Sequence, residues 1–382
     1  MNIEDIIKPE LCTGCSSCKN VCPTRAISME RNCHAENIPV INKNKCIDCG
    51  KCITICHSIN EVKKSDPMEC LVAYSLNLED KQHSASGGMA SVISRKFIAE
   101  GGAVCGVVWN NDMEAVHELA YSEHDLIKFK GSKYVESQLG DVSEIIRTLK
   151  SSRPVLYIGT PCQVAAIKQL ASKYEDKLFT VDLICHGMPP IQYFKEHIAD
   201  CGKNITDAKF RGEKDFWLRL YENEKCVYEQ FNWYDEYFSA FMENLIFREC
   251  CYSCKYATPE RIGDFTLGDF WGLSEDSSLA RYKGRKSLVL INTEKAKNLF
   301  DTVSSECEFE TRSFDEAKKE NRQLNHPSIP AEDRERFLEN YEKYGFNRAV
   351  KMTNTYRNIR LKKRLRIKNL FKQKILSMWR RK

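Results

Sequence analysis

Apolar and polar positions along residues 70–110 change from short continuous runs to a helical pattern and back. An apolar run at 71–74 is followed by a Ser/Gly-rich turn at 84–91, an apolar-periodic stretch at 92–98 and a second apolar run at 103–109. Continuous runs of this length are typical of buried strands, and a period near 3.6 is typical of a helix that covers a sheet. The pattern predicts a strand, a turn, a helix and a second strand, in that order.

The same succession recurs twice further along the chain, each time with a cysteine where the apolar run ends. The run at 154–159 leads through Cys162 into a helical pattern, and the run at 179–184 leads through Cys185 into a helix expected over about 191–199. Runs that alternate with helices favour parallel strands, and ligands collect at the carboxyl ends of such strands. We therefore expect a mixed α/β domain in which Cys162 and Cys185 lie side by side.

These patterns, with the cysteines and charges described below, divide the chain into three parts. We predict a small N-terminal module over residues 1–62, a larger mixed α/β (α+β) domain over 68–348, and a basic C-terminal helix over 349–382. Residues 315–348 are charged and are interrupted at Pro327 and Pro330, so we expect helices there that pack on the outside of the large domain.

The composition is that of a globular protein with two or three cores. Apolar residues make up 42% of the 382 positions, and no run approaches the ~18 consecutive apolar residues that a membrane span needs. The polar start at residues 1–5 lacks the basic-then-apolar pattern of a signal peptide. These features predict a cytoplasmic location.

The net charge of +5 conceals a division between body and tail. Residues 351–382 contain 13 Lys or Arg and no Asp or Glu, which leaves 45 basic and 53 acidic side chains, a net charge of −8, in residues 1–350. Apolar residues are interleaved with the basic ones, and on a helical wheel most of them fall in one broad half. We therefore predict a basic amphipathic helix.

Such a helix suits an anionic membrane surface and would place the protein at the inner face of the membrane. An exposed or partner-binding helix is the alternative interpretation. Binding to nucleic acid is disfavoured, because no reading motif accompanies the charge and the acidic body would repel phosphate.

Nineteen cysteines are many for a chain without an export signal. Cytosolic thiols stay reduced, so regularly spaced cysteines indicate metal ligands before disulfides. Eight of them form a repeat in which two C-x2-C-x2-C-x3-C runs begin 34 residues apart, at Cys12 and Cys46. In such runs three cysteines wrap one iron-sulfur cubane and the fourth binds its neighbour. One 4Fe-4S cluster is assigned to Cys12, Cys15, Cys18 and Cys56, and the other to Cys46, Cys49, Cys52 and Cys22.

The alternative for this segment is a pair of zinc sites, but zinc takes two close pairs of ligands and has no use for four cysteines in this run. Gly14 and Gly50 allow the ligand loops to turn. The segment resembles bacterial two-cluster ferredoxins in both halves. It departs from them at His57, where the family usually has proline, and we expect this residue to loosen the turn after Cys56.

A third cluster is predicted from a later C-x2-C pair, Cys251 and Cys254. The pair supplies two ligands, and Cys162 and Cys185 are the best-placed candidates for the other two. Pro161 as a first helical residue would put Cys162 at a helix N-terminus, which favours its thiolate. The alternative is that lone cysteines are small buried apolar residues, which we expect of Cys33, Cys70, Cys105, Cys201, Cys226, Cys250 and Cys307.

Seven motifs follow one another along the large domain. They are Ser84–Gly88, Gly131–Ser137, Gly159–Gln163, Cys185–Pro189, Cys251–Cys254, Arg261–Gly272 and Lys283–Leu288. In this order the motifs resemble the coenzyme F-420 hydrogenase/dehydrogenase beta-subunit family, with a ferredoxin domain fused in front. The resemblance runs from about residue 11 to 344.

The resemblance implies a flavin, FAD or FMN, beside the third cluster. It implies that Ser86, Gly87 and Gly88 lie at the flavin phosphates, and that Lys133 and Tyr134 lie at the flavin or the second substrate. The cavity would also be lined by Asp269, Phe270 and Trp271, although the two aromatic residues are equally well explained as core. A cation such as Lys133 near the flavin stabilises the anionic reduced ring.

These features together predict an iron-sulfur flavoprotein oxidoreductase. It would exchange hydride with an unidentified substrate or deazaflavin-type coenzyme, and the resemblance extends to bacterial members associated with surface polysaccharide biosynthesis. The redox partner would be a protein or a small-molecule reductant. The alternative is a non-catalytic electron-transfer adaptor. No proton donor is assigned: His186 adjoins a predicted ligand, and we expect the surface to carry His83, His117, His124, His197 and His326.

Overall fold

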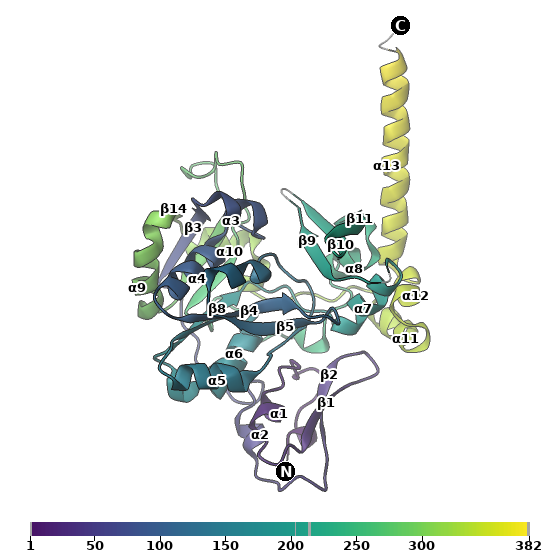
Figure 1. The fold of residues 1–382 in the computed structure, drawn as a ribbon. Coiled ribbons are helices and arrows are strands. Elements are labelled where there is room, and N and C mark those ends of the chain that lie inside the picture. The colour runs from purple at the N-terminus through teal and green to yellow at the C-terminus, as the bar shows by residue number, and fades with distance from the viewer. Residues whose placement is uncertain (1, 203, 213–214, 380–382) are drawn as a thin grey trace.

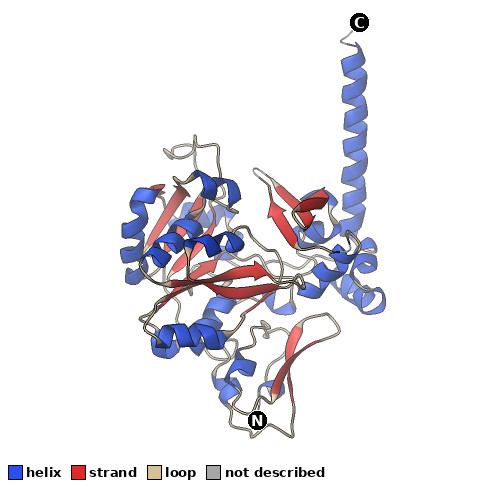
Figure 2. Cartoon of the chain, in the orientation of Figure 1, coloured by secondary structure: helices blue, strands red, loops and turns tan. Residues whose placement is uncertain are grey.

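The computed structural model describes residues 2–202, 204–212 and 215–379, with side chains up to residue 366. A small N-terminal module lies against a large α/β domain, and a single long helix leaves the body at the C-terminus (Figure 1). Helices and strands alternate through the large domain (Figure 2). The predicted fold class is confirmed.

A nine-stranded mixed sheet forms the centre of the large domain, in the order β14-β3-β13-β12-β8-β7-β4-β5-β6. The parallel strands β4, β7, β8 and β12 form its middle, and antiparallel strands flank them. Its strands are β3 Glu69–Ser75, β4 Ala103–Trp109, β5 Ala115–Ala120, β6 Ser137–Gln138, β7 Val155–Gly159, β8 Leu178–Leu183, β12 Phe265–Asp269, β13 Ser287–Ile291 and β14 Cys307–Thr311. The predicted parallel pairing of the runs that precede Cys162 and Cys185 is confirmed, because β7 and β8 are neighbours.

Alternate residues of the strands face two separate cores, because successive side chains in a strand point to opposite faces. In β3, Leu71 and Ala73 belong to one buried cluster and Val72 to another. Helices α4 Met89–Ala99 and α9 Glu294–Val303 cover the first core, and α5 Val142–Lys150 and α6 Pro161–Leu170 cover the opposite side of the sheet. Two shorter helices, α3 Leu78–His83 and α10 Phe314–Glu320, also pack on β3. Short 3-10 turns join these elements at Ile3–Asp5 (η1), Glu123–Phe129 (η2), Ser172–Tyr174 (η3), Asn232–Tyr234 (η4), Glu249–Cys251 (η5), Ser304–Glu306 (η6) and Arg322–Leu324 (η7).

A second, three-stranded antiparallel sheet was not predicted from the sequence. It consists of β9 Asp207–Arg211, β10 Phe216–Glu222 and β11 Lys225–Phe231. It shares an aromatic-rich core with α7 Ile191–Ala199, α8 Glu236–Met242, α11 Arg334–Tyr344 and α12 Phe346–Lys351. The helix expected over about 191–199 is therefore confirmed, and it packs in this core.

Two histidines expected at the surface are buried instead. His197 bonds through Nε2 to the buried Asp235 (2.8 Å), whose carboxylate also accepts from the hydroxyl of Tyr228 (2.8 Å). His117 lies between the carbonyl oxygens of Gln138 and Ile158, and burial lowers its pKa to about 4. The expectation was wrong for both, because each ring finds polar partners on other elements; the exposed positions of His83, His124 and His326 are confirmed.

The N-terminal module consists of two similar halves. Each half has a short helix, α1 Ser17–Val21 or α2 Lys51–Thr54, and a two-stranded sheet joins β1 Ile27–Arg31 to β2 Asn37–Ile41. Gly14, in the ligand loop before α1, and Gly50, at the N-cap of α2, have left-handed backbones with φ +68° and φ +71°, so the role expected of these glycines is confirmed. At Gly14 a Cβ atom would also lie 2.7 Å from Glu136 Oε1 of the large domain.

The basic tail forms one helix, α13 Asn354–Trp379. Its start is attached to the body: Ile359 is buried, Lys362 lies over the ring of Trp233, and Thr355 donates to Glu243 (2.8 Å). Further along, Leu361 and Leu365 are exposed. The prediction of one apolar face is wrong, because over 26 residues the apolar and basic positions are spread around the whole helix. The tail side chains from residue 367 onward lie outside the described residues.

No helix in the described ranges combines the length and the apolar character that crossing a bilayer requires.

Candidate functional site

The four cysteines assigned to the first cluster lie together in the N-terminal module. Burial, together with the neighbouring thiols of Cys15, Cys12 and Cys56, raises the pKa of Cys18, and burial raises the pKa of Cys12 to about 12. When buried thiols lie close together, each one opposes the ionisation of the others. A positively charged centre among them is required before they can act as thiolate ligands.

The second set of cysteines surrounds a small cavity in the other half of the module. Its lining includes all four predicted ligands, which are Cys22, Cys46, Cys49 and Cys52. Apolar residues between the two sets, among them Ile27 and Ile41, form the core of the module. The internal repeat of the sequence is therefore a repeat of two thiol-lined sites in space.

The third set comes together at the carboxyl ends of β7 and β8. Cys162 is in the first turn of α6, Cys185 follows β8, and Cys251 and Cys254 come from the segment that begins at η5. Burial raises the pKa of Cys162, which has the thiols of Cys254 and Cys185 as neighbours, and burial raises that of Cys185 to about 12. Pro161 is the first helical residue as predicted, but burial opposes the thiolate that this position was expected to favour at Cys162.

The spacing of the sulfur atoms argues against zinc at these sites. In the described part of the chain no three cysteine sulfurs all lie within 4.8 Å of one another. Zinc bonded at about 2.3 Å brings its sulfur ligands within roughly 4 Å of each other. In a cubane each cysteine binds a different iron atom, so the sulfurs stand farther apart. The spacing of the described cysteine sulfurs therefore differs from that of a closed zinc site.

The remaining cysteines divide into buried and exposed ones. Cys70, Cys105, Cys250 and Cys307 are buried, as expected of small apolar residues, and Cys201 is half-buried. Cys33 and Cys226 are exposed, so the expectation was wrong for these two. Both lie in β-hairpins at the surface, where there is no core for them to enter.

A histidine and a tyrosine separate the first cysteine set from the third. His57 is fully buried and contacts the hydroxyl of Tyr256 through Nδ1 (2.7 Å) and that of Thr13 through Nε2 (3.1 Å). The ring of Tyr256 packs in one buried cluster with Cys15, Cys162 and Cys254. A single layer of side chains therefore lies between the two sets.

The turn after Cys56 is closed, contrary to the loosening expected from His57. The carbonyl oxygen of Cys56 accepts from the backbone N–H groups of Ile59 (3.1 Å) and Asn60 (2.8 Å). Although burial alone would raise the pKa of Cys15, the charge and hydrogen bond of His57 lower it to about 6. The residue that departs from the ferredoxin pattern therefore contacts both a predicted ligand and the large domain.

The Ser/Gly turn lies where β3 leads towards α4, at the same edge of the sheet. Ser86 Oγ donates to the carbonyl oxygens of Lys286 (3.1 Å) and Gly268 (3.3 Å). A Cβ atom on Gly87 would lie 2.5 Å from Ala73 O, and Gly88 has φ +89° at the N-cap of α4. These contacts require a turn packed tightly against the strand ends.

An arginine that was not predicted from the sequence forms hydrogen bonds to two of the predicted residues at this edge of the sheet. Arg211, the last residue of β9, donates to Asp269 Oδ2 (2.8 Å) and to the hydroxyl of Tyr134 (2.8 Å). Its guanidinium also lies over the ring of Phe216, 4.1 Å from the centroid. Nothing in the sequence around Arg211 distinguishes it from other charged strand residues, because its role depends on the unpredicted sheet.

A second arginine, Arg285, lies within a motif of the family resemblance, which implied no role for it. It donates to the carbonyl oxygens of Ala85 (2.8 Å) and Gly212 (2.6 Å). It therefore ties the Ser/Gly turn to the end of β9. Burial and then the charge of Arg211 lower its pKa, which shows that the two guanidinium groups are close.

Lys133 adjoins Tyr134 in the chain, and His186 has Arg211 as a neighbour. Lys133 is half-buried; burial lowers its pKa to about 8, and within the described residues its ammonium has no hydrogen-bond or ion-pair partner. Burial and then the charge of Arg211 lower the pKa of His186. Since His186 directly follows Cys185, Arg211 lies near the third cysteine set.

The two aromatic residues after Asp269 have different environments. Phe270 is buried in the core beside Val72 and Leu288, which favours the core interpretation. Trp271 is 41% exposed and stacks on Phe216 with the centroids 6.4 Å apart. Trp271 is thus the aromatic residue that remains available to a ligand.

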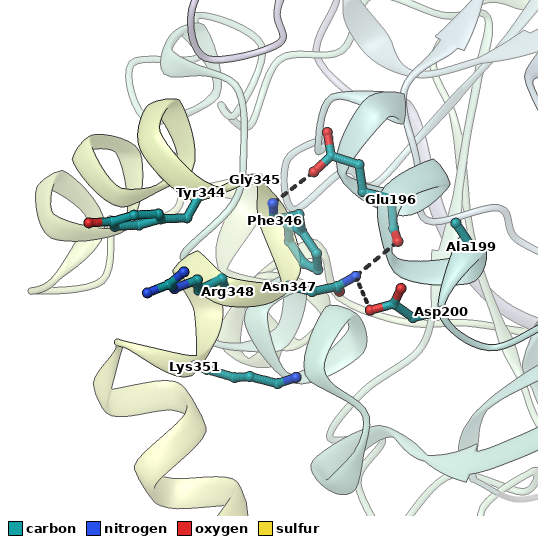
Figure 3. Close-up of a pocket in the computed structure, with 9 residues that line it drawn as sticks. All are labelled: Glu196, Ala199, Asp200, Tyr344, Gly345, Phe346, Asn347, Arg348 and Lys351. Atoms are coloured by element: carbon teal, nitrogen blue, oxygen red, sulfur yellow. Dashed lines mark hydrogen bonds between the residues drawn. The ribbon is translucent and has the colours of Figure 1, made fainter.

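A separate surface pocket of about 570 Å³ contains none of the predicted residues. It lies between α7 and the start of α12 (Figure 3). Asn347 Nδ2 donates to Asp200 (2.8 Å) and to the carbonyl oxygen of Glu196 (2.9 Å), so these polar groups of the lining bond to one another. The pocket lies where one helix packs on another, and its described side chains form no cluster of reactive or ligand-binding groups.

Comparisons with known proteins find two family matches in the chain. Residues 152–317 match the family that comprises the C terminus of the coenzyme F420 hydrogenase/dehydrogenase beta subunit, and residues 4–57 match the 4Fe-4S dicluster domain. Among curated proteins, Ferredoxin-1 of Rhodobacter capsulatus is 37% identical over 60 residues, which cover 14% of this chain and 85% of the ferredoxin. An uncharacterized polyferredoxin-like protein of Methanocaldococcus jannaschii is 27% identical over 122 residues, covering 26% of this chain and 73% of that protein.

Among solved structures, a chain of the F420-reducing [NiFe] hydrogenase complex from Methanosarcina barkeri matches with 18% identity and a TM-score of 0.43. The match covers 75% of this chain and 91% of that one. The chain is thus an iron-sulfur electron-transfer protein related to the coenzyme F420 hydrogenase/dehydrogenase beta subunit, with a 4Fe-4S dicluster domain at its N-terminus.

Proposed function

We propose that this protein is an iron-sulfur flavoprotein oxidoreductase with three 4Fe-4S clusters and one flavin. The observation that carries the proposal is the order of the sites in space. The two thiol sets of the N-terminal module are followed by the His57 and Tyr256 layer, then by the third set, and then by His186 and Arg211. A chain of neighbouring redox sites that ends beside cationic side chains is suited to deliver electrons to a bound cofactor.

Each cluster has its four cysteine ligands in this proposal. Cys12, Cys15, Cys18 and Cys56 hold the first, Cys22, Cys46, Cys49 and Cys52 the second, and Cys162, Cys185, Cys251 and Cys254 the third. Support comes from the convergence of each set and from sulfur spacings that exceed those of zinc.

The side chains at the strand ends fit a flavin by their chemistry. Lys133 and Arg285 supply positive charge, Trp271 supplies an exposed ring, and Asp269 and Tyr134 are fixed by Arg211. A flavin bound there would accept two electrons as hydride and release them singly, as iron-sulfur carriers require. Ser86, Gly87 and Gly88 pack the turn that leads into α4, whose first N–H groups have no acceptor within the helix and favour a phosphate.

The residues proposed to hold the flavin have separable tasks. Lys133 remains largely protonated at neutral pH, because its lowered pKa of about 8 still lies above 7, so it can neutralise negative charge on the bound ring. Arg211 keeps Asp269 and Tyr134 in place and closes the space from the side of the second sheet. His57 and Tyr256 exclude water between the first and third thiol sets.

Anaerobic analysis of the purified protein tests the cofactor content. Three cubanes and a flavin predict roughly 12 iron atoms and about one flavin per chain. Lys133→Met should weaken flavin binding by about tenfold or more, because a charge-assisted contact contributes about 1.5–3 kcal/mol. The iron content of this variant should remain unchanged.

The matched control for Lys133 is Lys128→Met, which removes an exposed cation from η2. This variant should retain the flavin. Eight iron atoms and no flavin in the unaltered protein would contradict the proposal, as would equal flavin retention by the two variants.

The second candidate is a non-catalytic adaptor that passes electrons to a partner enzyme. The dicluster domain favours it, because such a domain transfers electrons and needs no substrate of its own. Under the oxidoreductase proposal, a small-molecule donor reduces the bound flavin in the isolated protein. Reduction only in the presence of a redox partner protein would favour the adaptor.

The amino-acid sequences of two motifs support a proposal for the physiological role of the protein. This role is surface polysaccharide biosynthesis in the cytoplasm. The Cys185–Pro189 and Gly268–Gly272 segments carry that resemblance. Loss of the surface polysaccharide in a cell that lacks this protein, restored by the unaltered chain, is the corresponding test.

We also propose that the basic tail binds an anionic membrane surface by charge. Removing residues 367–382 leaves the attached start of α13 intact but deletes six Lys or Arg residues, each worth roughly 1 kcal/mol near such a surface. The truncated protein should no longer sediment with phosphatidylserine-containing vesicles at low salt. Equal sedimentation of both forms, or binding to neutral vesicles, would contradict this proposal.

A further inference from the structure

Three possible metal ligands meet where the N-terminal module contacts α11. Cys33 and His34 lie in the turn between β1 and β2, and Glu342 lies on α11. Their thiol, imidazole and carboxylate donor atoms all lie within 4.8 Å of one another. None of the three belongs to the sets assigned to the clusters or to the residues proposed to hold the flavin.

The turn that carries Cys33 and His34 is held in place by the surrounding structure. Asn32 Oδ1 accepts from the backbone N–H groups of His34 (3.0 Å) and Glu36 (2.9 Å), and Ala35 is buried. From the large domain, the hydroxyl of Tyr193 donates to His34 O (2.7 Å). The position of the donors is therefore fixed from both sides of the contact.

The donor atoms already interact with one another. Nε2 of His34 lies 3.1 Å from Glu342 Oε1. Burial and then the hydrogen bond to Glu342 raise the pKa of Cys33. A divalent cation would replace the proton that the thiol and the carboxylate share, and that proton would pass to water.

The donor set selects the kind of metal. Thiolate, imidazole and carboxylate are the three protein ligands of zinc, which bonds them at about 2.0–2.3 Å in a tetrahedron. Such a tetrahedron has edges of roughly 3.3–3.8 Å, so the donors need to approach by about 1 Å. Because Cys33 and Glu342 are exposed, their side chains are free to make this adjustment.

We propose that Cys33 Sγ, His34 Nε2 and the Glu342 carboxylate bind one Zn²⁺ ion, with water as the fourth ligand. The ion fastens the β1–β2 turn of the N-terminal module to α11 of the large domain. The site is distinct from the three cluster sites, in which the sulfurs are too far apart for a single ion.

Protection of cysteines from alkylation tests this site in the intact, cluster-containing protein. Cys226 is also exposed and lies in another hairpin, so it is an internal control. Stoichiometric Zn²⁺ should slow iodoacetamide labelling of Cys33 at least tenfold and leave Cys226 unchanged, as measured by peptide mass spectrometry under anaerobic conditions. Equal labelling rates of Cys33 with and without Zn²⁺ would overturn the proposal.

Metal analysis of variants provides the second measurement. After desalting, the unaltered protein should retain about one zinc per chain, and Glu342→Gln should lose it, at constant iron content. Glu339→Gln removes an exposed carboxylate from the same helix and should retain the zinc. Zinc retained by Glu342→Gln, or zinc gained only as iron is lost, would show that the ion binds elsewhere.

Discussion

Replacing Cys254 by serine should lower the iron content from roughly 12 to roughly 8 atoms per chain, because a cubane that loses one of four thiolates no longer persists at that site. Cys254 has Cys162, Cys185 and Cys251 as neighbours, and all four come from segments at the carboxyl ends of β7 and β8 or from the loop beside them. The cluster absorbance should fall by about one third, since the two N-terminal sites are untouched.

The adjacent cysteine provides the matched control. Cys250 is buried beside Arg248 and is the immediate neighbour of Cys251 in the chain, but it is not assigned as a ligand. Cys250→Ser should therefore keep roughly 12 iron atoms. If this variant loses a cluster and Cys251→Ser does not, the assignment of the third set is wrong. If Cys254→Ser keeps all its iron, the third cluster does not exist at this place.

The parts of the site that could be predicted are those in which residues that lie close in space also occupy related positions in a repeat or a strand pattern of the sequence. The eight N-terminal cysteines follow a repeat whose period is visible directly, and each helix and loop that carries them is short. Cys162 and Cys185 could be paired because both end apolar runs, and parallel strands bring such ends to one edge.

The parts that could not be predicted depend on contacts between distant segments. Arg211 reaches Asp269 only because an unpredicted sheet packs beside the strand ends. His57 contacts Tyr256, which lies 199 positions further along the chain. His117 and His197 are polar residues within strands or helices, and only the fold shows which acceptors bury with them. The error in the tail is different, because it concerns a local pattern: over the full length of α13 the apolar positions drift around the helix and do not share one face.

Replacing Arg248 by methionine should destabilise the protein by about 3–5 kcal/mol, because it removes one partner of a buried ion pair. Arg248 donates to Glu136 Oε1 (2.8 Å) and, across the contact between the domains, to the carbonyl oxygens of Asn37 (3.0 Å) and Cys12 (3.2 Å). The variant leaves a carboxylate buried without its partner, and burial already raises the pKa of Glu136 in the presence of the arginine. The shift in urea midpoint, measured anaerobically, reports the loss.

A double variant separates the cost of the orphaned carboxylate from the loss of contact between the domains. If the unpaired charge dominates, Arg248→Met with Glu136→Gln should recover part of the stability, because an amide is less costly to bury than a carboxylate. Arg219→Met, which breaks the pair with Glu229 in the exposed hairpin, should cost less than about 1 kcal/mol. A loss at Arg248 no larger than that at Arg219 would mean that the pair contributes little to attaching the N-terminal module. The contact of His57 with Tyr256 and the turn at His34 would then be the interactions that hold the thiol sets in their fixed order in space.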